Sequence, residues 1–195
     1  MNVLFLNGAL RRKGSTEGAI DICVNHIKAK YPHADTQVVY LCEEEIENCT
    51  SCYKCDEDGK CYINDSVFGI VQKMLDADVI IYAFPVNAFG LSSIMQRFLE
   101  RAGVGYLRFK RPLRNKLSGV IITGRRYSHE IAWAQISLNI MLNEMILVGS
   151  GFCPFIKNDG KALGSKIIDE EGINSLIAMI DRIMNFQGVE IKTNH

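Results

Sequence analysis

The chain has 195 residues, 48% of them hydrophobic and 23% charged, which is ordinary for a globular domain. Lys and Arg number 22, as do Asp and Glu, and this balance excludes an overall field that attracts nucleic acid or a membrane surface. No segment approaches the roughly 18 apolar residues of a membrane span, and the apolar start Val3–Leu6 is too short for a signal peptide, so we expect a cytoplasmic protein whose residues 1–195 form a single domain.

Short apolar runs alternate with amphipathic stretches from the start of the chain to its end. The runs are continuously hydrophobic, as in parallel strands that are buried on both faces. They predict strands at Val3–Leu6, Val38–Leu41, Val79–Phe84, Val120–Ile122 and Ile146–Val148, with Phe152–Ile156 continuing or flanking the last.

Helices are predicted between these strands, because apolar residues there recur every three or four positions. The expected helical ranges are 20–31, 67–75, 94–102, 128–144 and 173–184. Asp65 or Ser66 is expected to cap the second helix, and Ser93 with Gln96 to form a capping box at the start of the third. Ser128 is expected to cap the fourth helix, and the last helix is expected to end near Gly188.

Repeated alternation of strand and helix predicts a doubly wound α/β fold, with a five-stranded parallel sheet inside three α/β/α layers. Right-handed crossovers place every strand-to-helix loop at the carboxyl edge of the sheet. In the flavodoxin-like strand order 2-1-3-4-5, the chain reverses direction across the sheet between strands 1 and 3, and ligands bind in the crevice that opens there. The loops after strands 1, 3 and 4 therefore predict the site.

The helix expected at 128–144 carries more apolar surface than one sheet face can cover. We interpret the excess as an interface in a homodimer or homotetramer, with cover by loop 158–169 as the alternative. One face holds Ile131, Ala134, Leu138, Met141 and Met145, and further apolar surface comes from Trp133, Ile136 and Ile140.

The first of the three loops, residues 7–16, runs directly into a helix. A helix N-terminus offers unpaired N–H groups and a positive dipole end, which suit a phosphate. Ser15 and Thr16 add hydroxyl groups, and Arg11 adds charge and a forked set of donors. The order Lys13-Gly14 reverses that of a Walker loop, and G-x-G-x-x-G is absent, so neither an ATPase nor a dinucleotide-binding fold is supported.

The loops after strands 3 and 4 face each other across the predicted crevice. A planar ring can lie against Val86 and Phe89 in the first of them, while main-chain groups bond its edge. The second, Thr123-Gly124-Arg125-Arg126, brings N–H donors and positive charge, which would stabilise a ring that becomes anionic on reduction.

Together, the three loops resemble the NADPH-dependent FMN reductase superfamily. The matching motifs are Gly8-Ala9-Leu10-Arg11-x-x-Gly14-Ser15-Thr16 and Pro85-Val86-Asn87-Ala88-Phe89-Gly90 followed by Gln96-Arg97-Phe98-Leu99-Glu100-Arg101. The resemblance implies that FMN binds non-covalently, with its phosphate held by Arg11, Ser15 and Thr16. It further implies that Pro85, Val86, Asn87, Ala88, Phe89 and Gly90 line the ring, with Thr123, Gly124 and Arg125 at its other edge.

The sequence departs from the family pattern at two places. Ala9 stands where the family has a serine, so this cofactor-binding position lacks one phosphate hydroxyl. Asn87-Ala88 replaces a common aromatic pair, which changes the ring stacking and the polarity expected there.

A loop insertion, residues 42–65, holds four cysteines in the pattern C-x2-C-x2-C-x5-C. In a reducing cytoplasm this spacing points to metal or redox chemistry. Four thiolates on a short loop can surround a [4Fe-4S] cluster, and Gly59 lets the chain turn back for the fourth. A zinc site, a disulfide or free thiols are the alternatives. The candidate ligands are Cys49, Cys52, Cys55 and Cys61.

This compact pattern resembles the iron–sulfur flavoproteins, a branch of the same superfamily in which some relatives keep cysteines without a metal. The remaining cysteines, Cys23, Cys42 and Cys153, lie in apolar contexts and are interpreted as structural. Seven acidic residues between Glu43 and Asp58 would lower the potential of a cluster. Seven basic residues between Arg97 and Lys116 form either a solvated surface or a contact for a phosphate-bearing cosubstrate.

The leading hypothesis is an FMN-dependent oxidoreductase or electron-transfer flavoprotein with a [4Fe-4S] cluster. The first alternative is a cluster-free NAD(P)H-dependent FMN or quinone reductase, in which the basic stretch 108–116 receives NAD(P)H as cosubstrate. The second is a non-catalytic flavodoxin-like binding module. The expected partner is a redox donor or acceptor protein or a small-molecule acceptor. No catalytic side chain is predicted, because the flavin carries the chemistry and Ser128-His129-Glu130 is explained as a helix start.

Overall fold

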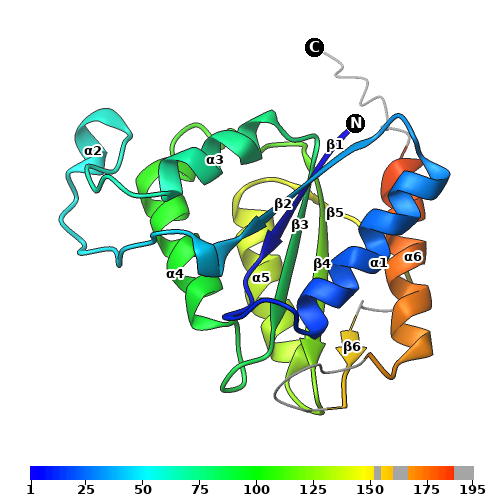
Figure 1. Cartoon of the computed structure of the whole chain (residues 1–195). Coiled ribbons are helices and arrows are strands. Elements are labelled where there is room, and N and C mark those ends of the chain that lie inside the picture. Colours follow the sequence, from blue (N-terminus) through cyan, green and yellow to red (C-terminus); the bar gives the residue numbers. More distant parts are fainter. Residues whose placement is uncertain (152–154, 160–166, 187–195) are drawn as a thin grey trace.

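The continuously apolar runs form one parallel sheet in the computed structural model, which describes residues 1–151, 155–159 and 167–186. The strand order is β2-β1-β3-β4-β5, with β6 also paired to β4, so the predicted flavodoxin-like order is confirmed (Figure 1). All five pairings of neighbouring strands are parallel. The strands are β1 (Asn2–Asn7), β2 (Asp35–Tyr40), β3 (Val79–Pro85), β4 (Leu117–Gly124), β5 (Ile146–Leu147) and β6 (Phe155–Lys157).

The last position in the sheet is shared by two short strands. β5 pairs with the beginning of β4, where Leu117 faces Ile146, and β6 pairs with its end, where Ile122 faces Phe155. Phe155 and Ile156 of the expected segment 152–156 therefore continue the fifth position, while residues 152–154 lie outside the described part of the chain.

Two strands begin earlier than their apolar runs indicate. β2 starts at Asp35 because it is an edge strand, and its polar first half lies partly in solvent. β4 starts at Leu117 and includes Ser118, whose hydroxyl donates to the Ile80 carbonyl over 3.1 Å. Gly119 fits there because a Cβ would come within 3.0 Å of the Met179 sulfur. Because Ser118 and Gly119 interrupt the hydrophobic run, the sequence did not predict that β4 begins at Leu117.

Helices cover both faces of the sheet, which makes the predicted three layers (Figure 1). Val3 and Phe5 pack with α1 (Ser15–Lys30) and α6 (Glu170–Met184). Leu4 and Leu6 point to the other face, where α3 (Val67–Asp76), α4 (Ser93–Ala102) and α5 (His129–Leu142) pack. This alternation gives each face its own apolar core. Within the described ranges, no helix is both long and apolar enough to cross a membrane.

Three short helical elements lie at or next to the cysteine insertion. A 3₁₀ turn, η1 (Leu41–Glu43), follows β2, and α2 (Cys55–Asp58) lies away from the sheet (Figure 1). Gly59 ends α2 at a φ of 74°, the left-handed conformation that glycine adopts without strain. A π-helical turn, η2 (Gly103–Leu107), extends α4, and the Arg108 N–H donates to the Gly103 carbonyl.

The helix caps in the structure agree only in part with those predicted from the sequence. Asp65 accepts a hydrogen bond from the Val67 N–H over 3.1 Å, as predicted for the start of α3. The predicted capping box of α4 is wrong, because Ser92 is the cap and its side chain accepts from the Met95 N–H. Ser128 stands at the N-cap position of α5 but has a φ of 65° and makes no side-chain cap. Helix α6 ends at Met184, and Gly188 lies outside the described residues.

The apolar faces of α5 are the reverse of the predicted ones. Ala132, Ile136 and Ile140 are buried against the sheet. Both faces are apolar, so spacing alone did not decide which one packs inward. The exposed face carries Ile131, Leu138, Met141 and Leu142, with exposed fractions between 54% and 68%, whereas the nearby Met145 is buried.

One polar network ties α1 to α6 across the outer layer. The Asp181 carboxylate accepts hydrogen bonds from His26 at 2.7 Å, Lys30 at 2.9 Å and Tyr31 at 2.9 Å. Partial burial alone would raise the pKa of Asp181, but these hydrogen bonds outweigh it and lower the pKa from 3.8 to about 2. The ionised form is therefore the one that stabilises the folded chain.

We predict that Asp181→Asn lowers the free energy of unfolding by about 1 kcal/mol at neutral pH. A lowered pKa in the fold means that the stabilisation is fully present above pH 4 and is lost as the pH falls toward 2. The difference between the variant and the parent protein should shrink over that window in urea titrations. Asp76→Asn, at an exposed carboxylate, is the control. A difference that stays constant down to pH 2 would contradict the assignment.

Candidate functional site

The three predicted loops lie side by side at one rim of the sheet. Their strands are neighbours in the order β1-β3-β4, and each loop begins at the carboxyl end of its strand. Backbone hydrogen bonds continue from the sheet into the loops, because the Gly8 N–H donates to Ala83 and the Val86 N–H donates to Thr123, over 2.7 and 2.8 Å. The turns at Arg11, Pro85 and Gly124 are thereby held around one space.

That space is a cavity of about 380 Å³, within the range of small-molecule sites. Its lining includes most of the residues predicted for a cofactor: Ala9, Arg11, Ser15, Thr16, Pro85, Val86, Asn87, Thr123, Gly124 and Arg125. Leu10, Gly14 and Asn158 also line it and were not predicted. Asn158 belongs to the segment after β6, and its N–H donates to the Gly124 carbonyl, so pairing of β6 with β4 brings it there.

The end of the cavity at α1 is built to receive an anion. Ser15 and Thr16 occupy the first turn of the helix, and both side chains are buried. The Thr16 hydroxyl lies 2.7 Å from that of Thr123 and shares a hydrogen bond with it. The Ser15 hydroxyl is buried without any partner among the described residues. A buried polar group without a partner is costly, and a phosphate at this helix terminus would satisfy it.

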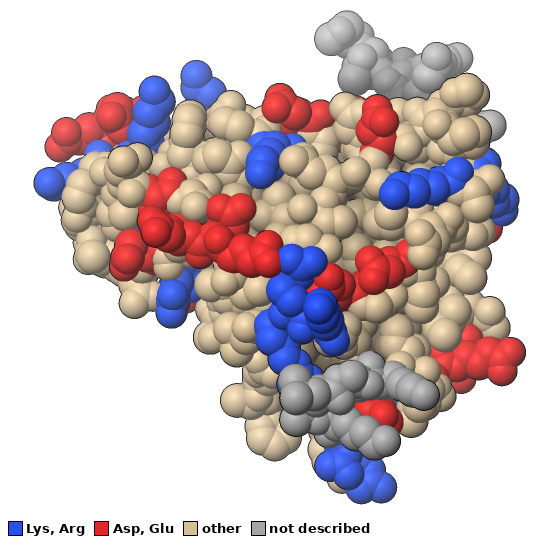
Figure 2. Space-filling model, in the orientation of Figure 1, with Lys and Arg blue, Asp and Glu red and all other residues tan. Residues whose placement is uncertain are grey.

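Two neighbouring arginines in the first loop have different surroundings. Arg12 forms an ion pair with Glu17 at 2.7 Å, contacts Glu43, and lies 3.5 Å from the centre of the Tyr40 ring. Hydrogen bonds that the guanidinium donates to the Glu17 and Glu43 carboxylates raise the pKa of Arg12. Arg11 forms no ion pair with any residue in the described ranges, and it lines the cavity, so its charge is available to a ligand. Figure 2 shows basic side chains gathered beside this loop, next to a band of acidic ones.

The loop after β3 divides into two parts. Pro85, Val86 and Asn87 line the cavity, but Ala88, Phe89 and Gly90 do not. Asn87 and Gly90 exchange two backbone hydrogen bonds of 3.0 Å, so the chain makes a tight turn between them. The φ angles of 45° at Ala88 and 68° at Phe89 are unfavourable for residues with a Cβ. Phe89 is 68% exposed at the tip of this turn and does not line the cavity.

The loop after β4 is shaped by contact with the next helix. A Cβ on Gly124 would lie 2.7 Å from Nε2 of His129, so only glycine fits there. His129 begins α5 as predicted and is buried with Nε2 unpartnered among the described residues. Burial lowers the pKa of His129, so the ring is neutral at pH 7. The histidine therefore supports the Gly124 turn by packing.

The four predicted cysteine ligands all line a second cavity, of about 180 Å³. It lies between the insertion and the end of α4, and Cys55 is buried in it with its thiol donating to the Val104 carbonyl. In the ranges that the structure covers, no three His, Cys, Asp or Glu side chains are close enough together to hold a metal ion. The sulfurs thus share a cavity, and the loop must close further for all of them to bind one metal group.

Two arginines that were not predicted complete this cavity. Arg101 and Arg108 line it together with the cysteines. Arg101 is only 1% exposed and forms an ion pair with Asp65 at 2.6 Å. The sequence did carry a signal for Arg101, because it is the last residue of the second family motif. Nothing in the composition of the basic stretch separates Arg108 from its exposed neighbours.

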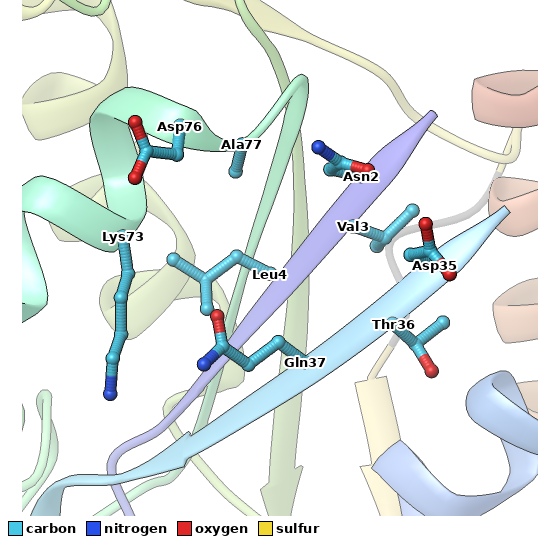
Figure 3. A pocket seen from close by; sticks show the side chains of 9 residues that line it. All are labelled: Asn2, Val3, Leu4, Asp35, Thr36, Gln37, Lys73, Asp76 and Ala77. Atoms are coloured by element: carbon cyan, nitrogen blue, oxygen red, sulfur yellow. The ribbon is translucent and has the colours of Figure 1, made fainter.

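A further groove lies away from both cavities. It is lined by the first residues of β1, the first residues of β2 and the end of α3, including Lys73 and Asp76 (Figure 3). These are the amino ends of the strands, so the groove opens on the rim opposite the three loops. It contains none of the predicted site residues.

Comparisons with known proteins agree with this arrangement. Residues 1–157 match the family model described as NADPH-dependent FMN reductase. An iron-sulfur flavoprotein of Methanocaldococcus jannaschii is 32% identical over 151 residues, which is 76% of each chain. An iron-sulfur flavoprotein of Archaeoglobus fulgidus is 24% identical over 196 aligned positions, covering 94% of each.

Solved structures show the same fold. NADH:FMN oxidoreductase (EMOB), in its apo form, superposes with a TM-score of 0.69 at 16% identity, covering 100% of this chain and 94% of that one. The family match spans all three loops and the cysteine insertion. This chain belongs to the NADPH-dependent FMN reductase family and is an oxidoreductase of that type.

Proposed function

We propose that the chain binds FMN non-covalently in the cavity at the carboxyl ends of β1, β3 and β4, and that it carries a [4Fe-4S] cluster on its cysteine insertion. When bound, FMN accepts a hydride or single electrons, and the cluster transfers single electrons. The observation that carries the flavin part is the buried, unpartnered hydroxyl of Ser15 at the start of α1, inside a cavity of suitable size.

Different residues around the cavity would contact the phosphate and the ring of FMN. Ser15, Thr16 and the N–H groups of the first turn of α1 hold the phosphate, and Arg11 supplies a cation that no acid among the described residues pairs with. Pro85 to Asn87 bound the ring on one side. Thr123 to Arg125 lie at its other edge, where positive charge favours the reduced, anionic ring.

We predict that Ser15→Ala weakens FMN binding about tenfold, because a hydrogen bond to a charged phosphate is lost. The same change should not destabilise the protein without FMN, since the hydroxyl has no partner there. FMN titration and urea unfolding of the apoprotein measure the two effects.

Ser137→Ala is a matched control for this variant. The Ser137 hydroxyl is likewise buried without a partner in the described structure, but it is on α5 and does not line the cavity. Its loss should leave FMN affinity unchanged. Equal affinity of FMN for Ser15→Ala and the parent protein would refute the phosphate site.

The cluster is supported by the shared cavity of the four cysteines and by the names of the relatives in Methanocaldococcus and Archaeoglobus. The donor set is chemically suitable, because cubane clusters are held by four cysteine thiolates. Cys49, Cys52, Cys55 and Cys61 would hold it. The loop from 49 to 61 is short enough to close around one group, and Gly59 already turns the chain back toward Cys61.

We predict that Cys52→Ala and Cys55→Ala each abolish iron and sulfide binding after anaerobic reconstitution, while FMN stays bound at its separate cavity. Iron, sulfide and flavin analysis with an absorption spectrum measures all three. Cys42→Ala is the control, since Cys42 does not line the cysteine cavity. Full iron content in both cavity variants would exclude Cys52 and Cys55 as ligands, and a parent protein that takes up no iron would exclude the cluster.

The competing function is a cluster-free NAD(P)H-dependent FMN or quinone reductase. It is favoured by the arrangement of the thiols, since among the described residues no three of them are assembled for a metal. Metal-free protein that steadily oxidises NADPH with free flavin or quinone, at the rate of the reconstituted protein, would support this function over the first.

We further propose that the exposed apolar face of α5 joins two copies of the chain. Ile131, Leu138, Met141 and Leu142 form this face. It continues toward the flavin cavity, because the Gln135 side chain accepts from the Leu91 N–H beside the Ala88–Phe89 turn. A second copy on α5 would therefore lie next to the proposed flavin and cover the exposed Phe89.

Leu138→Glu combined with Met141→Glu should convert the assembly to monomers, because two charges would be buried at the interface. Sedimentation velocity measures this change. Ile168→Glu, at a similarly exposed apolar residue outside α5, should leave the assembly unchanged. A parent protein that is already monomeric at micromolar concentration would refute the interface.

A further inference from the structure

We propose that Arg101 and Arg108 are positioning residues for the cluster, which hold Cys61 and Cys55 against the end of α4 and make the cluster easier to reduce. The inference rests on the proposed function, since it concerns residues around the proposed cluster. It assigns a role to two of the seven basic residues between Arg97 and Lys116.

Arg101 links the insertion to the core of the protein. Its guanidinium meets the Asp65 carboxylate through both terminal nitrogens, at 2.6 and 3.2 Å, and donates to the Glu47 carbonyl over 2.8 Å. One of these nitrogens also lies 3.5 Å from the Cys61 sulfur. The side chain that touches Cys61 is therefore also bonded to the insertion on both sides of the cysteines, at Glu47 and at Asp65.

Arg108 makes the corresponding contact to a second sulfur. Its Nη2 lies 3.5 Å from the Cys55 sulfur, and its Nε donates to the Val104 carbonyl over 2.9 Å. The same guanidinium forms an ion pair with Asp56. The arginine therefore stands between the sulfur and the nearest member of the acidic flank, whose charge it offsets.

The backbone between the two arginines forms the wall on which the cysteines rest. This wall is the π-helical turn η2, a rare conformation that frequently occurs at functional sites. The Cys55 thiol donates to Val104 within it. A Cβ on Gly105 would come 2.9 Å from the Cys61 Cβ, so glycine allows the insertion to approach this closely.

The contacts are unevenly distributed over the four thiols. Arginine nitrogens lie within 3.5 Å of Cys55 and Cys61, whereas in the described part of the chain none is bonded to Cys49 or Cys52. A four-thiolate cluster gains negative charge on reduction, and hydrogen bonds and positive charge at its sulfurs raise the reduction potential. The two arginines therefore oppose the acidic residues of α2, Asp56, Glu57 and Asp58.

The test uses the anaerobically reconstituted protein with FMN bound. Arg108→Gln should keep its full iron and sulfide content but shift the cluster midpoint to a more negative potential. A tenfold loss in the preference for the reduced form corresponds to a shift of about 59 mV for one electron. Arg108→Lys, which keeps the charge, should recover part of the shift. Arg114→Gln, which removes a surface cation paired with Glu144, is the matched control and should not move the potential.

Arg101 is tested with a double variant, because its loss alone would leave the Asp65 charge buried and unpaired. Arg101→Gln with Asp65→Asn removes both charges together. We expect it to retain less iron than the parent protein, since Cys61 is no longer held, while FMN affinity is unchanged. An EPR-monitored redox titration and iron analysis give the two readouts.

The outcomes separate this inference from the function on which it rests. If the parent protein takes up no iron, the proposed cluster is refuted, and the inference about the two arginines is refuted with it. If the parent protein takes up iron and Arg108→Gln shows the parent potential, only the role of the arginines is overturned. A more negative midpoint in Arg108→Gln at full iron content supports both.

Discussion

Parallel pairing of β1 with β3 and of β3 with β4 is the constraint on which the whole arrangement depends. It aligns three carboxyl ends that are far apart in the sequence and lets each loop bond to the strand beside it. The cavity is then enclosed by backbone whose position is set by sheet hydrogen bonds. Side chains add specificity, but the register decides that Ser15 and Gly124 face the same space.

The two cavities differ in how the charged and polar groups that line them are compensated. At the start of α1 the Ser15 hydroxyl and the Arg11 cation have no partner within the part of the chain that the structure describes, which suits a ligand that brings its own negative charge. Around the cysteines, by contrast, charged side chains pair with one another, as Arg101 does with Asp65. Burial alone would lower the pKa of Arg101, but the Asp65 carboxylate and the Cys61 sulfur outweigh this and raise it, so the guanidinium stays charged.

The sequence could predict the strand order, the loops and most of the cavity lining, because these follow from apolar runs and from helix starts. It could not predict details that depend on tertiary contact. Either face of α5 could pack inward, since both are apolar. Ser92 rather than Ser93 became the cap because its hydroxyl also donates to the Gly8 carbonyl. The turn at Ala88 and Phe89 has no glycine at its two left-handed positions, and Arg108 is indistinguishable by composition from a surface arginine.

Helix α4 connects the two cavities mechanically. Its cap, Ser92, is bonded to the first loop at Gly8, and its last turn carries Arg101 against the insertion. Ten residues at about 1.5 Å of rise each make a strut of about 15 Å that neither stretches nor compresses appreciably. The length of this one helix therefore sets the separation between the phosphate loop and the sulfur-lined wall at its far end.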